Sequence, residues 1–190
     1  MRISKPAMQA ATVAASKETT RYSISSVRFE PAGPDDTGSL IATDGHRLHK
    51  LTLHDSTAHP IPEPFTLELP DLKQAVKAMG ANSIATVEKP EGGRAKLHID
   101  GAATVSAAVV DGEYPDWRFV MPKAEKATLS IGVNPQYLID ALQAAMRLNA
   151  RKGDAVKLTF HDAEGLCPMT VETISAETEL VAVIMPMRLS

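Results

Sequence analysis

The residues that could do chemistry in this chain are few. His46, His49 and His54 are close in the sequence, but alternation along a strand sends His49 to the opposite face from the other two. His54, Asp55 and Ser56 have the side chains of a hydrolase triad only as sequence neighbours, whereas working triads draw their members from distant segments. The spacing therefore favours neither a metal site nor a nucleophilic centre.

Other catalytic signatures are missing as well. The sequence has no glycine-rich phosphate loop ending in Lys-Ser or Lys-Thr, no paired cysteine and no His-Glu-x-x-His. Its one cysteine, Cys167, stands in Gly-Leu-Cys-Pro and is expected to be a buried structural thiol. A single cysteine excludes an internal disulfide and fits a reducing compartment. We expect a binding protein that is not an enzyme and that needs no cofactor or metal.

The most distinctive stretch is Ala42–Leu48, which reads Ala-Thr-Asp-Gly-His-Arg-Leu. Asp-Gly between two alternating apolar segments predicts a hairpin turn, because glycine tolerates the positive φ that a tight turn needs. A turn alone does not account for His46, Arg47 and Leu48 directly after it. These three residues form a donor-rich corner with an apolar end, which indicates a binding surface.

The composition is that of an ordinary soluble globular protein. Of the 190 residues, 44% are hydrophobic and 23% are charged, enough for a sizeable core in one large or two small domains. The net charge of −3 argues against condensing on nucleic acid through bulk electrostatics but allows a local basic face. No run approaches the roughly 18 apolar residues of a membrane span, and the first residues lack a signal-peptide pattern. We expect a cytoplasmic protein.

The chain is organised as a threefold repeat. Three helix-like segments each follow a short strand and begin near Pro6, Pro70 and Pro135, which are 64 and 65 residues apart. They are expected to run to about Lys17, Met79 and Ala150. In each segment, apolar residues at helical spacing form one line along the helix, called here its apolar line. These lines are Met8, Ala11 and Ala15, then Leu72, Val76 and Met79, and finally Leu138, Leu142 and Ala145.

Three strand-like runs follow each helix. They are Tyr22–Glu30, Ser39–Thr43 and Arg47–Leu53, then Ile84–Glu88, Ala95–Ile99 and Thr104–Val110, and finally Ala155–Phe160, Met169–Ile174 and Leu180–Met185. Each repeat therefore reads β-α-β-β-β, which predicts an α+β fold of antiparallel sheets with helices on one face. A lone repeat would expose one sheet face and both edges, so repeats must pair with each other or with another chain.

Three stretches resemble the signature motifs of the bacterial sliding clamp family, the beta subunit of DNA polymerase III. They are Ala42–Leu48, Asp111–Asp116 and Val183–Leu189, in the family's order. The resemblance implies a DNA-clamp fold with three β-α-β-β-β units where family members have six. Residues 1–122 resemble the family's complete middle domain, and residues 123–190 resemble the second half of its last domain.

The resemblance also implies a site. In the family these motifs meet in a hydrophobic pocket, where polymerases, the clamp loader and repair proteins dock through a short linear peptide. Carried over residue by residue, the pocket uses Arg21, Ile24, Thr43, Gly45, His46, Arg47, Leu48, Pro115, Val120, Val183, Met185, Pro186, Met187 and Arg188. Taken singly, Leu48 and Val120 fit core residues better, and Met185–Met187 fits an ordinary terminal strand. Phe119 replaces a residue that is often basic in the family and is expected to enlarge the apolar rim.

Family helices line a central hole, where their basic side chains contact DNA phosphates loosely. The corresponding candidates are Lys5, Lys17, Lys73, Lys77, Arg147, Arg151 and Lys152, and a solvated helix face is an equally good interpretation of each. Few phosphate contacts imply weak, sequence-independent binding of double-stranded DNA. Two functions stay open: a clamp that encircles DNA as a homo-oligomer, or an adaptor or decoy that binds peptides without forming a ring.

Overall fold

The computed structural model describes residues 1–18, 23–33, 37–54, 61–122, 127–148, 155–161, 167–174 and 179–188. The chain divides into two compact units, Met1–Met121 and Pro122–Ser190, called here the N-terminal and C-terminal units. The order of elements is β-α-β-β-β in three successive repeats, which confirms the predicted repeat. None of the helices in the described ranges is long and apolar enough to cross a membrane.

The N-terminal unit contains the first two repeats. The first consists of β1 (Arg2–Ser4), α1 (Lys5–Ala14), β2 (Ser26–Glu30), β3 (Gly38–Thr43) and β4 (Leu48–Leu53). The second consists of β5 (Phe65–Glu68), α2 (Leu69–Ala78), β6 (Ile84–Val87), β7 (Arg94–Ile99) and β8 (Val105–Ala108). Both helices have a proline in the first turn, where its missing N–H costs nothing.

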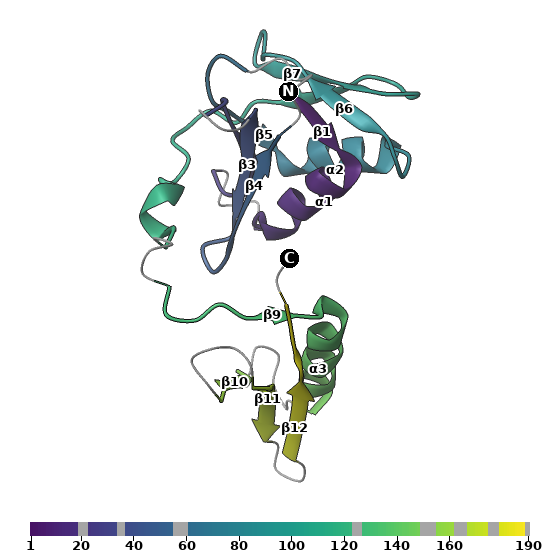
Figure 1. Ribbon diagram of the computed structural model, residues 1–190. Coiled ribbons are helices and arrows are strands. Elements are labelled where there is room, and N and C mark those ends of the chain that lie inside the picture. The colour runs from purple at the N-terminus through teal and green to yellow at the C-terminus, as the bar shows by residue number, and fades with distance from the viewer. Residues whose placement is uncertain are drawn as a thin grey trace. The chain divides into compact units, whose positions relative to one another are not determined.

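The two repeats of this unit exchange their first strands. The sheets run β1-β6-β7-β8 and β4-β3-β2-β5, so each repeat's first strand lies at the edge of the other repeat's sheet. These pairings are all antiparallel. Helices α1 and α2 pack against each other, and each covers the sheet of its own repeat (Figure 1). The exchange therefore joins two half-covered sheets into one closed core.

The core of the N-terminal unit follows the predicted periodicities. Alternate residues of β2 point into it, and Val27 and Phe29 are each 1% exposed. The Phe29 ring stacks on that of Phe65 in the paired strand β5, with centroids 5.0 Å apart. The helices contribute the expected apolar lines, including Met8 and Leu72, to the same cluster.

The C-terminal unit holds the third repeat. It consists of β9 (Gly132–Val133), α3 (Pro135–Leu148), β10 (Lys157–Phe160), β11 (Met169–Ile174), β12 (Glu179–Ile184) and β13 (Pro186–Met187). The sheet runs β10-β11-β12, and β13 pairs separately with β9. Helix α3 packs on β11 and β12 (Figure 1). The buried core here is small and centres on Ala141, Met169, Val171 and Ile184.

Two predicted element boundaries differ from the structure by more than two residues. Helix α1 ends at Ala14 and not near Lys17, because Ala15 is extended and the next N–H, that of Ser16, donates to the Ile24 carbonyl. Strand β2 begins at Ser26, because residues 23–25 form a turn in which the Ser26 hydroxyl donates to the Ser23 carbonyl at 2.6 Å.

One prediction of burial was also wrong. Cys167 is exposed, because it precedes β11 and the small core of this unit begins only at Met169. Val120 is 68% exposed, because it lies in a segment that crosses the outside of a sheet, where no further layer covers it among the described residues. The exposure of Val120 argues against the core interpretation of this residue, and its place in the peptide pocket stays a prediction.

Candidate functional site

The turn between β3 and β4 is held together by its own side chains. The Asp44 carboxylate accepts hydrogen bonds from the N–H groups of His46 and Arg47 at 3.0 and 3.1 Å, and from Arg47 Nε at 3.0 Å. These hydrogen bonds, with that of His46 foremost, and the Arg47 charge hold the pKa of Asp44 below its usual range. Gly45 has a φ of 89°, and Thr43 pairs with Leu48. The predicted hairpin is thereby confirmed.

The donor-rich corner after the turn is used largely within the fold. Arg47 Nη2 donates to the Val13 carbonyl at 3.0 Å, and His49 Nδ1 lies 2.7 Å from the Ala10 carbonyl. Val13 belongs to the last turn of α1, whose carbonyls have no partner within the helix. Arg47 therefore caps α1 from outside and fixes the helix end against the hairpin.

A polar hollow of about 280 Å³ lies between this turn and the chain that leaves α1. It is lined by Ala15, Ser16, Lys17, Glu18, Asp44, His46 and Arg47. Ile24 is buried nearby, where its carbonyl accepts a hydrogen bond from the Ser16 N–H at 2.9 Å. Arg21 lies outside the described residues. The pocket residues predicted on this hairpin thus lie beside a polar hollow at the α1 end, and the half-buried Leu48 lies at the strand end.

The segment that follows β8 crosses the face of the first repeat's sheet that α1 does not cover. The Tyr114 hydroxyl donates to the Ile41 carbonyl at 3.3 Å, and burial raises the pKa of Tyr114 to about 12. A short 3₁₀ helix, Trp117–Val120, follows, and Lys50 Nζ lies 5.2 Å from the centroid of the Trp117 ring. Pro115 is carried exposed on this segment.

Glu30 is the anchor of this segment. Its side chain is only 10% exposed and accepts hydrogen bonds from Arg28 Nε at 3.0 Å and Trp117 Nε1 at 3.3 Å, while Arg118 Nη2 lies 3.4 Å away. Burial alone would raise the pKa of Glu30, but these donors and the two arginine charges outweigh it and lower the pKa. The anchored segment presents Phe119, which is 89% exposed. Sequence reasoning missed Glu30, although its two-residue spacing from Arg28 places both on one strand face.

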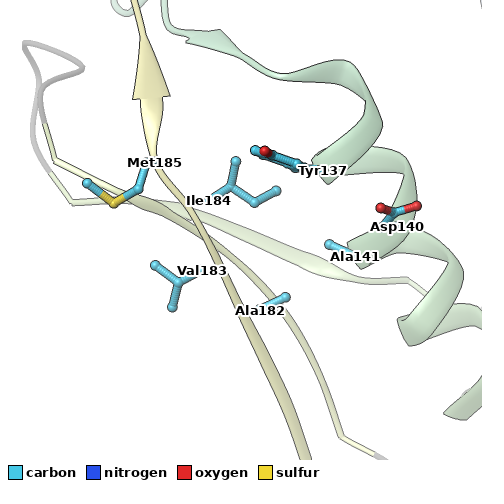
Figure 2. A pocket seen from close by; sticks show the side chains of 7 residues that line it. All are labelled: Tyr137, Asp140, Ala141, Ala182, Val183, Ile184 and Met185. Atoms are coloured by element: carbon cyan, nitrogen blue, oxygen red, sulfur yellow. The ribbon is translucent and has the colours of Figure 1, made fainter.

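An apolar groove lies between α3 and β12 in the C-terminal unit. It has a volume of about 340 Å³ and is lined by Tyr137, Asp140, Ala141, Ala182, Val183, Ile184 and Met185. Figure 2 shows the Tyr137 ring reaching from the helix toward the strand, with Ile184 turned to the helix and Val183 and Met185 to the other side. Tyr137, Val183 and Met185 are 60%, 61% and 63% exposed.

Val183 and Met185 were predicted for this site, but Tyr137, Asp140 and Ala141 were missed. The available signal in the sequence was Tyr137, an aromatic residue that does not belong to the apolar face predicted for its helix. Pro186 and Met187 form β13 opposite Val133 and Gly132, so part of the tail is the ordinary strand that was considered, yet Met187 is 55% exposed. Arg188 is exposed as well. The predicted residues fall into two groups, one on each unit, and their union in one pocket stays a prediction.

The predicted DNA-facing residues differ in their surroundings. Lys73 and Lys77 are exposed on α2, Arg147 is exposed in the last turn of α3, and Lys17 is exposed after α1. Lys5 donates from Nζ to the Met79 carbonyl at 2.6 Å and so ties the start of α1 to the end of α2. Arg151 and Lys152 lie outside the described residues. Within the described ranges, no three His, Cys, Asp or Glu side chains gather as a metal site would require.

Comparison with known proteins places this fold. A beta sliding clamp from Micrococcus luteus is 26% identical over 154 residues, which make up 80% of this chain and 48% of that protein. The chain is a homologue of the bacterial beta sliding clamps. The DNA polymerase sliding clamp of Bacillus subtilis superposes with a TM-score of 0.74 at 23% identity, over 98% of this chain and 48% of that one. No protein-family model matches the chain.

A further solved relative is the DnaN sliding clamp, DNA polymerase III subunit beta, of Bartonella birtlesii, whose structure was determined bound to griselimycin. It matches with a TM-score of 0.73 at 19% identity, over 100% of this chain and 51% of that clamp. The chain thus spans about half the length of the clamps that it matches. The predicted DNA-clamp fold, with antiparallel sheets and one helix in each of three repeats, is confirmed.

Proposed function

We propose that this sliding-clamp homologue is a DNA replication or repair accessory protein that captures a short linear peptide of a polymerase or another DNA-processing partner. The observation that carries the proposal is the groove between α3 and β12. Its lining leaves Tyr137 exposed on the helix side of β12, and Val183 and Met185 exposed on the other side of the strand. Large apolar side chains that remain exposed in one groove are typical of interaction sites, and methionine adapts to varied partner side chains.

The N-terminal unit has a second set of exposed apolar groups that suit peptide contact. Phe119 and Val120 stand out from the segment anchored by Glu30, and the half-buried Leu48 lies on the same sheet face as Lys50. Anchoring holds the short 3₁₀ helix in place before any partner arrives, which lowers the entropy lost on binding. We propose each of the two sets as a surface for peptide contact, and the clamp homology supports both.

The affinity follows from the size of the site. Two or three anchored apolar side chains contribute about 1.5–3 kcal/mol each on burial. Ordering a flexible peptide takes back much of this free energy. Apolar burial alone therefore falls short of about −8 kcal/mol, the binding free energy of the roughly 1 μM complex that we expect, and hydrogen bonds to the peptide must supply the rest.

A titration with a fluorescein-labelled clamp-binding peptide of a bacterial replicative polymerase tests the proposal. Fluorescence anisotropy should rise to saturation with a roughly micromolar dissociation constant, and an excess of unlabelled peptide should reverse it. A scrambled peptide of the same composition is the matched control. Failure to approach saturation at about 1 mM chain would refute the proposed site.

The alternative, an adaptor or decoy that forms no ring, has an observation in its favour. Helix α1 contains one basic residue, Lys5, and its ammonium group already donates to the Met79 carbonyl. A helix face with few cations offers little attraction to phosphates. Retention on closed circular DNA separates the two functions, because a ring stays on a circle and slides off a linear duplex of equal length, whereas an adaptor is retained on neither.

A further inference from the structure

Among the described residues, the C-terminal unit leaves open a strand edge that is paired in both repeats of the N-terminal unit. In the first two repeats the strand after the helix is central, since β2 lies between β3 and β5, and β6 between β7 and β1. The corresponding strand of the third repeat is β10. Among the described residues it pairs with β11 alone, so that its other edge is open. The first strand, β9, likewise pairs only with β13 in this part of the chain.

The face of β10 that lies on the α3 side of the sheet is apolar and exposed. Leu158 pairs with Val171 and Phe160 with Met169, so both side chains share the face on which α3 packs. Val171 and Met169 are 0% and 3% exposed, whereas Leu158 and Phe160 are 45% and 42% exposed. Helix α3 covers β11 and β12, and no other element of the described ranges covers the β10 side of this face.

The same positions in the N-terminal unit are closed. The residues that correspond to Leu158 and Phe160 are at most 2% exposed there, and they are Val27 and Phe29 of β2 and Ala85 and Val87 of β6. What closes them is the other repeat, which adds its first strand at the edge and its helix beside the first helix. The chain thus contains a closed pair of repeats in its N-terminal unit and a single repeat in its C-terminal unit.

Helix α3 carries an apolar flank that points away from the groove. Tyr137 and Ala141 line the groove with β12, and the helical spacing puts Ile139 and Met146 on the opposite flank, next to Leu142. Ile139 and Met146 are 45% and 71% exposed. Aligned on the buried lines of the helices, the corresponding residues of α1 and its continuation are polar, namely Gln9 and Ser16. The third repeat therefore carries large apolar side chains on a helix flank where the first repeat carries polar ones.

We propose that a second copy of this chain closes the C-terminal unit by exchanging first strands, with β9 of each copy added to the open edge of the other copy's β10. The inference goes beyond peptide capture and does not depend on it. The register follows from the N-terminal unit, where Leu67 of β5 pairs with Val27 of β2 and Ile3 of β1 pairs with Ala85 of β6. Transferred to the third repeat, this register puts Val133 of one copy opposite Leu158 of the other.

A second copy fits better than an unrelated partner for a physical reason. Two-fold exchange satisfies both open edges and both apolar faces of the two copies at once, because each copy donates the strand that the other accepts. An unrelated strand at the β10 edge would leave β9 and the exposed flank of α3 uncovered. The first two repeats of the chain show that such an exchange between repeats forms a closed core.

Sedimentation equilibrium of the full chain tests the stoichiometry. We expect a dimer with twice the 20.3 kDa mass of the chain at micromolar concentration. Phe160→Lys should raise the dimer dissociation constant at least about 100-fold, since each interface would bury two charges in place of two rings. Because Phe160 is already partly exposed, the monomer should fold, which circular dichroism checks. Val181→Lys, on the other face of the same sheet, is the matched control and should leave the dimer intact.

A cysteine pair tests the register. In a Cys167→Ser chain, Val133→Cys together with Leu158→Cys should give a covalent dimer on mild oxidation, because the exchange brings these positions opposite each other. Val133→Cys with Val181→Cys should remain uncrosslinked. A monomer throughout the high micromolar range would overturn the proposal. So would a dimer that Phe160→Lys does not weaken or one that the Val133–Leu158 pair does not crosslink.

Discussion

Arg47 and Val13 lie 34 residues apart, and the Arg47 guanidinium donates a 3.0 Å hydrogen bond to the Val13 carbonyl oxygen. The same guanidinium bonds the Asp44 carboxylate through Nε at 3.0 Å. One side chain therefore holds the hairpin turn in shape and caps the last turn of α1. A cation at this end of the helix also complements its dipole. The hairpin that carries the proposed peptide contact Leu48 is thus held in shape before a peptide binds.

Replacing Arg47 tests this coupling. Arg47→Met should destabilise the end of α1 by about 1 kcal/mol, because the Val13 carbonyl loses its charged donor. Amide hydrogen exchange in the last turn of α1 should accelerate about fivefold. Lys50→Met, which removes a charge from the neighbouring strand without touching α1, should leave that exchange unchanged. Equal exchange rates in Arg47→Met and the parent chain would show that the cap has no energetic role.

The Glu30 anchor predicts a pH-dependent stability. Its folded pKa is lowered from the ordinary value of 4.5, so its contribution is fully present above that value and is lost as pH falls through the folded pKa. At pH 7, Glu30→Gln should lower the free energy of unfolding of the N-terminal unit by about 1–2 kcal/mol.

Urea unfolding at neutral and acid pH measures the gap in the free energy of unfolding between the parent chain and Glu30→Gln. The gap between Glu30→Gln and the parent chain should shrink steadily once the pH drops below 4.5, because the parent carboxylate then becomes protonated. Glu113→Gln, an exposed carboxylate in the anchored segment, is the control and should have little effect at either pH. A gap that is the same at both pH values would contradict the anchoring by charge.

Phe119 is expected to shape peptide preference. It is 89% exposed, so a peptide with an apolar residue nearby can bury part of the ring. Phe119→Arg should weaken binding of such a peptide about fivefold in an anisotropy titration, in keeping with partial burial of one aromatic side chain. Gln9→Arg adds the same charge on α1 and should not change the affinity. Unchanged affinity in Phe119→Arg would count against an apolar rim.

DNA binding, if it uses the helix faces, should respond to two lysines of α2. Lys73 and Lys77 are both exposed on this helix. Replacing both with Ala should flatten the slope of log K against log salt by about 1.8, since each lost phosphate contact contributes about 0.9. The measurement is anisotropy with a labelled duplex over a range of salt concentrations. Lys50→Ala with Lys96→Ala, two strand residues, is the matched control, and an equal change in slope there would contradict a helix-lined DNA face.

Local sequence signals were sufficient to predict the repeat and the hairpin. Proline at the start of each helix and apolar residues at helical spacing are local signals, and the resulting order of elements is confirmed. Asp44-Gly45 predicted the turn because the geometry of a turn depends on its own residues. In α3 the buried residues are Ala141 and the predicted Ala145, while the predicted Leu138 and Leu142 are partly buried beside them.

Contacts between distant segments could not be predicted in this way. The exchange of β1 and β5 depends on strands of three and four residues, which are too short to carry a periodic signal. The hydrogen bonds from Trp117 to Glu30 and from Arg47 to Val13 join residues 87 and 34 positions apart. Cys167 was misjudged because its residue type predicts burial, whereas the small core of the C-terminal unit does not reach it.

The peptide site is the central claim, and one set of affinities tests it most directly. The anisotropy titration with the clamp-binding peptide is repeated for Met185→Ala, Leu48→Ala and Val181→Ala. Met185→Ala and Leu48→Ala should each weaken binding about tenfold, because each removes an apolar anchor, while Val181→Ala outside the groove should stay within about twofold. If Met185→Ala and Leu48→Ala both bind the peptide as the parent chain does, the proposed site is wrong.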